Sequence, residues 1–128
     1  MIDSEQKFVV THFDAEHDFA VDTQQPHWMR RYTDIAAATQ GMAGVRITRA
    51  NGARADRSSE PLYNDVDLIL RYMLRGSMTV RFSGNGDHLT TTGSAWLQPP
   101  DVTHTVLEYS DDAEYLELAM PGDFGRVD

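Results

Sequence analysis

Short runs of alternating apolar and polar residues recur along the chain between residues 43 and 119. Such alternation is typical of β-strands, because successive side chains point to opposite faces of a sheet. The pattern predicts seven strands, at 45–49, 66–74, 78–82, 88–91, 95–97, 103–109 and 114–119. Short strands at this spacing favour a barrel or a sandwich.

Residues that favour tight turns separate these runs. Arg75-Gly76 and Gly84-Asn85-Gly86 supply the positive φ angles that tight hairpins need, and Pro99-Pro100-Asp101 fixes a corner. Consecutive strands are therefore expected to pair antiparallel. The segment from Asn51 to Tyr63 has no apolar alternation, which predicts a long loop over one mouth of a barrel.

The beginning of the chain differs from this pattern. Residues 1–30 are mostly polar and acidic, and are predicted to form an N-terminal arm ahead of a barrel domain at 31–128. Thr33-Asp34 and Gly41 bracket a helix of one or two turns at most. His27 and Trp28 are expected to pack at the surface without a role in the chemistry.

Composition excludes several classes of function. With 128 residues, of which 41% are hydrophobic, one domain with a single core is expected. A formal net charge of -9 disfavours binding to nucleic acid or to an anionic membrane. No cysteine is present, so thiolate nucleophiles and thiolate metal ligands are excluded. No long apolar run or leader-like N-terminus is found, so a cytoplasmic protein is expected.

The spacing of Gly93, Pro99 and His104 resembles the second motif of the cupins, Gly-x5-Pro-x-Gly-x2-His-x3-Asn. Asp101 stands at its second glycine and Glu108 at its asparagine. The resemblance extends over about 45–121 and to a group of small bacterial cupins of unassigned activity. It implies an all-β, RmlC-like jelly-roll barrel (a double-stranded β-helix), and a homodimer.

The first cupin motif, Gly-x5-His-x-His-x3,4-Glu-x6-Gly, matches only at its final glycine, Gly76. Ile69 occupies the glutamate position, and the histidine pair falls on Leu62 and Asn64 or on Tyr63 and Asp65. Because a divalent metal needs three or four converging donors, no cofactor is expected. Fe, Mn, Ni or Zn would require a substitute set drawn from His104, Asp65 or Asp67, Glu108 and His88.

Two assignments of the inward face are open for the strand at 66–74. Simple alternation buries Leu68, Leu70 and Tyr72, whereas the cupin register turns Ile69, Arg71 and Met73 inward. In the cupin register the later strand points His104, Val106 and Glu108 inward, with Leu107 and Tyr109 outward. The outward apolar face of the first strand would then need cover from the arm or from a second subunit.

The candidate site follows from the cupin register. His104 and Glu108 are the candidate catalytic or anchoring groups. The alternative for His104 is a hydrogen-bonded residue of a polar cavity, and the alternative for Glu108 is an exposed residue of the strand. Arg71 is either the countercharge of an anionic ligand or the ion-pair partner of Glu108. Further candidates for contact with a ligand are Tyr63, Met73, Trp96, Gln98 and Arg46, although Met73 and Trp96 also suit a plain core.

Three functions are consistent with these residues. The first is a barrel that binds a small anionic or carbonyl-bearing molecule, with His104 as the acid or base of a metal-free isomerisation or cyclisation. The second is a non-catalytic ligand-binding or sensing dimer. The third is a metal-dependent, dioxygenase-like enzyme that uses the substitute ligands. The fold itself does not choose among them.

Overall fold

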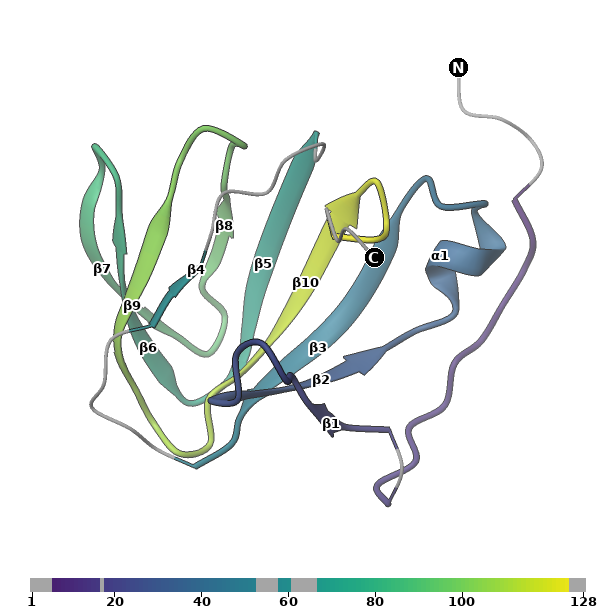
Figure 1. Ribbon diagram of the computed structural model, residues 1–128, viewed down its shortest axis with the longest axis horizontal. Helices are drawn as coiled ribbons and strands as arrows, with labels where there is room; N and C mark the ends of the chain where they lie inside the picture. The colour runs from purple at the N-terminus through teal and green to yellow at the C-terminus, as the bar shows by residue number, and fades with distance from the viewer. Residues whose placement is uncertain (1–5, 17, 53–57, 61–66, 125–128) are drawn as a thin grey trace.

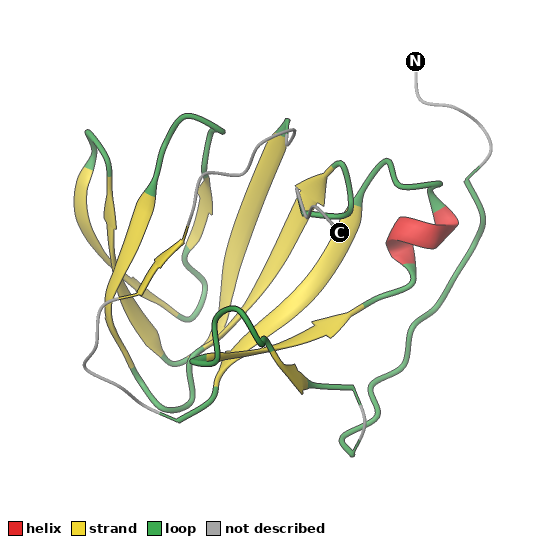
Figure 2. Cartoon of the chain, in the orientation of Figure 1, coloured by secondary structure: helices red, strands yellow, loops and turns green. Residues whose placement is uncertain are grey.

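The computed structural model describes residues 6–16, 18–52, 58–60 and 67–124 of the chain. Within these ranges ten strands form two antiparallel sheets, which curve toward each other around a common interior (Figure 1). The predicted all-β barrel is therefore confirmed. The short helix α1 (Ile35–Ala38) is also confirmed, and Figure 2 shows it beside the six-stranded sheet, far from the four-stranded one.

The six-stranded sheet has the order β1-β2-β3-β10-β5-β8. Its strands are β1 (Ala20–Val21), β2 (Trp28–Tyr32), β3 (Gly44–Ala50), β10 (Glu114–Met120), β5 (Leu68–Arg75) and β8 (Ala95–Leu97). The four-stranded sheet has the order β4-β9-β6-β7. Its strands are β4 (Ser58–Glu60), β9 (His104–Tyr109), β6 (Ser77–Phe82) and β7 (Gly86–Thr91).

The inward face of β5 follows the cupin register. Ile69, Arg71 and Met73 are buried, whereas Leu70 and Tyr72 are exposed on the outer face. Alternation by hydrophobicity alone gives the opposite result, because it places a guanidinium group outside and leucines inside. The arginine is buried here because it has a charged partner in the interior, which a reading of this strand by itself does not reveal.

The N-terminal region contributes more to the barrel than predicted. Strand β2 pairs with β3 and spans the expected arm boundary at residue 30, and Trp28 is fully buried rather than at the surface. The inward residues of β2 are Trp28 and Arg30. A buried arginine conceals the alternation of this strand, which explains why it was not predicted.

Strand β9 departs from strict alternation. His104 and Val106 are buried, as expected, but Glu108 is exposed and Tyr109 is buried, so the predicted inward position of Glu108 is wrong. The cause is a β-bulge: Val80 pairs with Val106 but Thr79 pairs with Glu108, which leaves Leu107 as the extra residue. One extra residue reverses the facing of everything after it.

The predicted hairpin glycines are confirmed, since Gly76, Gly84 and Gly86 all have positive φ. Part of the predicted long loop is instead strand β4, which pairs with β9. The candidate residues Tyr63 and Asp65, at the end of this segment and just after it, lie outside the described residues. In the described part of the chain, no helix has the length and hydrophobicity that crossing a membrane requires.

Candidate functional site

A layer of polar side chains, which we call the polar belt, crosses the interior of the barrel. It consists of Arg30, Arg46, Thr48, Arg71, Gln98, His104 and Glu117, all buried. Along β10 the inward residues are Tyr115, Glu117 and Ala119. Tyr115 belongs to the larger apolar cluster, and Ala119 to a smaller one with Ile69 and Phe124. The belt therefore lies between two apolar layers.

Glu117 is the centre of the belt and has no solvent exposure. Its Oε1 accepts hydrogen bonds from Arg46 Nε at 2.8 Å, Thr48 Oγ1 at 2.5 Å and Arg30 Nη1 at 3.2 Å. Its Oε2 accepts from Arg71 Nε at 2.9 Å and Arg46 Nη2 at 3.2 Å. One carboxylate thus receives charge-assisted hydrogen bonds from three guanidinium groups.

The ionisation of Glu117 follows from this arrangement. Burial by itself would raise the pKa of the carboxyl, but the nearby Arg46, Arg71 and Arg30 guanidinium groups outweigh it and hold the pKa well below the usual 4.5. Glu117 is therefore a charged group in the folded protein at neutral pH.

At one end of the belt, Arg30 also contacts the turn before β2. Its Nε donates to Asp22 Oδ2 at 3.2 Å and its Nη2 to Gln25 Oε1 at 3.2 Å. Partial burial raises the pKa of the Asp22 carboxyl, but hydrogen bonds from the backbone N–H groups of Gln24 and Gln25 and from Arg30, with the Arg30 charge, lower it overall. Arg30 thus contacts two carboxylates, those of Asp22 and Glu117.

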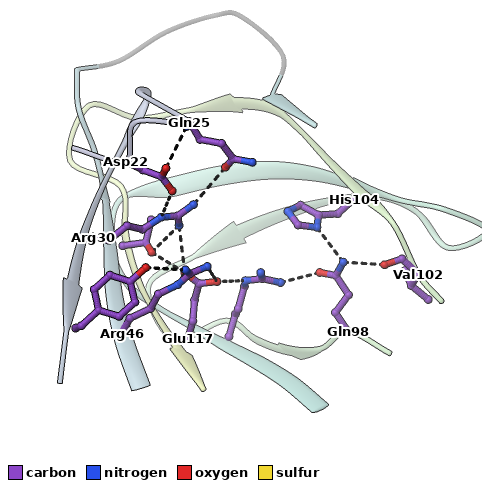
Figure 3. Close-up of polar contacts among 11 residues, drawn as sticks. Asp22, Gln25, Arg30, Arg46, Gln98, Val102, His104 and Glu117 are labelled. Carbon is purple, nitrogen blue, oxygen red and sulfur yellow. Dashed lines mark hydrogen bonds and ion pairs between the residues drawn. The ribbon is translucent and has the colours of Figure 1, made fainter. Parts of the chain in front are cut away.

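At the other end, the belt leads from Arg71 through Gln98 to His104. Figure 3 shows the Gln98 side chain beside His104 and Val102. Arg71 Nη1 donates to Gln98 Oε1 at 2.8 Å. Gln98 Nε2 lies 2.8 Å from the carbonyl oxygen of Val102 and 2.8 Å from His104 Nδ1. A continuous series of polar contacts therefore joins the buried Glu117 carboxylate to His104.

The aromatic side chains of Phe82 and Trp96 lie near this histidine end. The ring of Phe82 lies 6.4 Å from the His104 ring and 6.0 Å from the Trp96 ring, centroid to centroid. Trp96 pairs with Arg71 across β8 and β5, so both side chains point to the interior. The Trp96 Nε1–H is buried and has no hydrogen-bond partner among the described residues.

The structure brings together four of the predicted site residues, Arg46, Arg71, Gln98 and His104, in the belt. Met73 belongs to the larger apolar cluster, and Trp96 packs against the same cluster. Glu108 is separate from these residues, and Arg71 pairs with Glu117 rather than with Glu108. Tyr63 and Asp65 lie outside the described residues.

Sequence reasoning did not identify Glu117, Arg30, Thr48 or Asp22. Glu117 carries a usable signal, because it lies two residues from both Tyr115 and Ala119 and must share their inward face. An isolated glutamate on the apolar face of a strand indicates a buried charge and predicts cationic partners. Nothing in the local sequence of Arg30 or Thr48 reveals which carboxylate they contact.

The cupin fold implies a divalent metal, and the described side chains do not fit one. Within the described ranges no group of three histidine, aspartate or glutamate side chains lies close enough together to hold a metal ion. Nδ1 of His104 is in contact with Gln98, and Ile69 occupies the position of the cupin glutamate. The other described candidates for a substitute set, Asp67, His88 and Glu108, are all exposed.

Comparisons with known proteins rest on the fold alone. The chain matches neither a sequence profile of a known family nor a curated protein. It is similar to solved structures: ectoine synthase from P. lautus has a TM-score of 0.69 at 14% identity, over 90% of this chain and 79% of that one. The polyketide cyclase RemF from Streptomyces resistomycificus has a TM-score of 0.69 at 11% identity, over 88% and 80%.

A third similar structure is an RmlC-like cupin from Shewanella frigidimarina NCIMB 400. Its TM-score is 0.62 at 13% identity, and the match covers 88% of this chain and 93% of that one. At these identities the similarity concerns the fold and carries no activity with it. Together with the two curved sheets and the register of β5, it shows that the chain has the cupin fold.

Proposed function

We propose that this protein binds a small anionic or carbonyl-bearing molecule inside the barrel, at the end of the polar belt where His104 and Trp96 lie. The observation that carries the proposal is the Trp96 Nε1–H, a buried donor with no partner among the described residues. Leaving such a donor unpaired costs about 1–3 kcal/mol, which a ligand oxygen would recover.

The charge of the interior supports the same class of ligand. The guanidinium groups of Arg30, Arg46 and Arg71 are all buried in the belt beside the Glu117 carboxylate. Buried guanidinium groups are donors that suit an anion or the negative end of a carbonyl dipole.

The aromatic side chains near His104 support the same proposal. Phe82 and Trp96 provide flat apolar surface, and His104 and the indole N–H provide directional polar groups, which is the usual composition of such pockets. Two of the similar structures, an ectoine synthase and a polyketide cyclase, are named for small-molecule chemistry. If the bound molecule is converted at this site, we propose a metal-free isomerisation or cyclisation.

The test is a thermal-shift screen of the purified protein against small carboxylates, keto acids and matched neutral alcohols, each with and without a chelator. A ligand that binds only the folded state raises Tm. We expect carboxylates or keto acids to raise Tm, the chelator to leave the shift unchanged, and Trp96→Phe to reduce it. His12→Ala, an exposed histidine outside the barrel, is the control.

Two results would count against the proposal. One is a Tm shift that appears only when Fe, Mn, Ni or Zn is added, with stoichiometric metal found by elemental analysis. The other is an equal response of wild type to alcohols and acids. Conversion of a stabilising compound, followed by NMR of the mixture, separates an enzyme from a binding or sensing protein.

A further inference from the structure

We propose that Gln98 holds His104 as the Nε2–H tautomer, so that His104 meets a ligand as a hydrogen-bond donor. Gln98 is then a positioning residue, because its contact with His104 determines which imidazole nitrogen carries the hydrogen. The tautomer assignment rests on contacts within the protein, and only the identity of the ligand atom rests on the proposed function.

The orientation of the Gln98 amide is fixed from two sides. Arg71 Nη1 has only hydrogens to offer, so the amide atom 2.8 Å from it is Oε1. The carbonyl oxygen of Val102 only accepts, so the atom 2.8 Å from it is Nε2. A flipped amide would place two donors face to face at Arg71 and two acceptors face to face at Val102.

The orientation of the amide then decides the tautomer. Nε2 of Gln98 is a donor, and it lies 2.8 Å from His104 Nδ1, so Nδ1 must accept. In a neutral imidazole one nitrogen accepts and the other carries the hydrogen. The hydrogen of His104 is therefore on Nε2.

The arrangement is held rigidly because each member is buried and anchored by the next. Arg71 is 1% exposed and donates its Nε to Glu117, which Arg46 and Thr48 also hold. Gln98 and His104 are 5% and 7% exposed, so water has little access to replace their contact. Rotation of the Gln98 amide would therefore disrupt the belt as far as Glu117.

Three chemical consequences follow. A general base needs a lone pair, but the Nδ1 lone pair accepts from Gln98 and Nε2 carries a hydrogen. A metal needs the same lone pair, so coordination through either nitrogen would require this arrangement to break. A ligand that reaches His104 must present an acceptor, such as a carbonyl or carboxylate oxygen, and Trp96 Nε1–H favours the same atom type.

The tautomer is read directly by two-bond ¹H–¹⁵N correlation spectra of the ¹⁵N-labelled protein at neutral pH. Five histidines contribute, and the His104 signals are assigned by their loss in His104→Gln. We expect the Nε2–H pattern for His104 in the protein without ligand. An Nδ1–H pattern, or a charged ring, in wild type would overturn the proposal.

Two variants test whether Gln98 is responsible. In Gln98→Glu the side chain accepts at both oxygens, so the His104 hydrogen is expected to move to Nδ1. Gln98→Met removes the polar contact and should give a mixture of tautomers. An unchanged Nε2–H pattern in folded Gln98→Glu would overturn the role of Gln98. If Gln98→Glu does not fold, the wild-type and Gln98→Met spectra still decide.

The outcome is separable from that of the proposed function. The spectra need no ligand, so an Nε2–H tautomer together with a negative ligand screen would reject only the binding proposal. A positive screen together with an Nδ1–H tautomer would reject only the tautomer assignment.

Discussion

At the scale of single residues, Glu117 has the largest energetic effect that the structure predicts. Replacing it with glutamine leaves Arg30, Arg46 and Arg71 buried without their shared anion. Removal of one partner of a buried ion pair costs about 3–5 kcal/mol. Glu117→Gln is expected to lower the free energy of unfolding by this amount in urea titrations.

The matched control for this substitution is Glu108→Gln, which makes the same chemical change on an exposed residue. We expect its effect to stay within about 0.5 kcal/mol. Equal losses for the two variants would contradict the assignment of Glu117 as the centre of the belt.

The same residue governs how stability depends on pH. Its pKa is lower in the folded chain than its ordinary 4.5, so its contribution is complete above that value. Between pH 4.5 and the lower pKa of the folded state, the carboxyl takes up a proton in the unfolded chain but not in the folded one. The free energy of unfolding therefore declines in this range, by at most about 1.4 kcal/mol per pH unit for each carboxyl with a lowered pKa. Urea titrations between pH 7 and 3 measure this decline.

The Asp22 carboxyl also contributes stability that is lost in acid, since its pKa is lowered in the folded state as well. Asp22→Asn should therefore show a shallower loss of stability in acid than wild type. Parallel curves for the two proteins would show that the contact with Arg30 does not contribute.

At the scale of secondary-structure elements, β2 is an integral strand of the barrel. Trp28 is fully buried and lies against Tyr109, with ring centroids 4.6 Å apart, and against Tyr115 at 5.7 Å. Truncation of a buried tryptophan typically costs about 3–5 kcal/mol. Trp28→Ala should lose this much stability by denaturant titration, and the exposed Leu89→Ala almost none. A small effect of Trp28→Ala would restore the view of residues 1–30 as a separate arm.

The hairpin between β5 and β6 depends on glycine for two separate reasons. Gly76 has a φ of +71°, and a Cβ there would overlap Ser110, Asp112 and the backbone of Ala113. Gly84 has a φ of +75° but open space around it, so Gly84→Ala measures the backbone cost alone, about 1–2 kcal/mol. Gly76→Ala should cost about 1–3 kcal/mol more, because of the overlap. If Gly76→Ala and Gly84→Ala lose similar stability in thermal or urea unfolding, the neighbours of Gly76 move to make room for the added Cβ, and the predicted overlap has no effect.

Elements also show how far the sequence was predictive. The strands with apolar alternation, the short helix and the glycine turns were all predicted from local pattern. Strands β1, β2 and β4 and the bulge in β9 were not. Arg30 interrupts the alternation of β2 because its partner Glu117 is distant in the sequence, and the bulge at Leu107 reverses the facing of Glu108 without any local signal.

The candidate site was predictable to the same extent. Arg71, Gln98 and His104 follow from the cupin register, since residues two apart share a face. The partner of Arg71 does not, because pairing across the interior depends on which strands become neighbours. β10 lies between β3 and β5 only in the folded sheet, and no periodicity in the sequence encodes that position.

At the scale of the whole molecule, an apolar patch remains on the outer face of the six-stranded sheet. Leu70 and Leu97 are direct cross-strand neighbours, and with Tyr72 they are 38%, 59% and 44% exposed. An exposed apolar patch of this kind suits the interface of a two-fold dimer, which we predict here. Light scattering should give the mass of two chains, and Leu97→Asp should give one. Leu89 is 68% exposed on the other sheet, and Leu89→Asp should leave the dimer intact. A wild-type monomer would contradict this prediction.

The central position of β10 has a consequence for how the chain folds during synthesis. This strand is the last of the described strands in the sequence, yet it pairs with both β3 and β5. Until it leaves the ribosome, the edges of those two strands lack their partner, and Arg30, Arg46 and Arg71 lack their shared anion. Folding of the six-stranded sheet must therefore follow release of residues near 120. Nascent chains that stall earlier would expose unpaired strand edges, which are prone to aggregation.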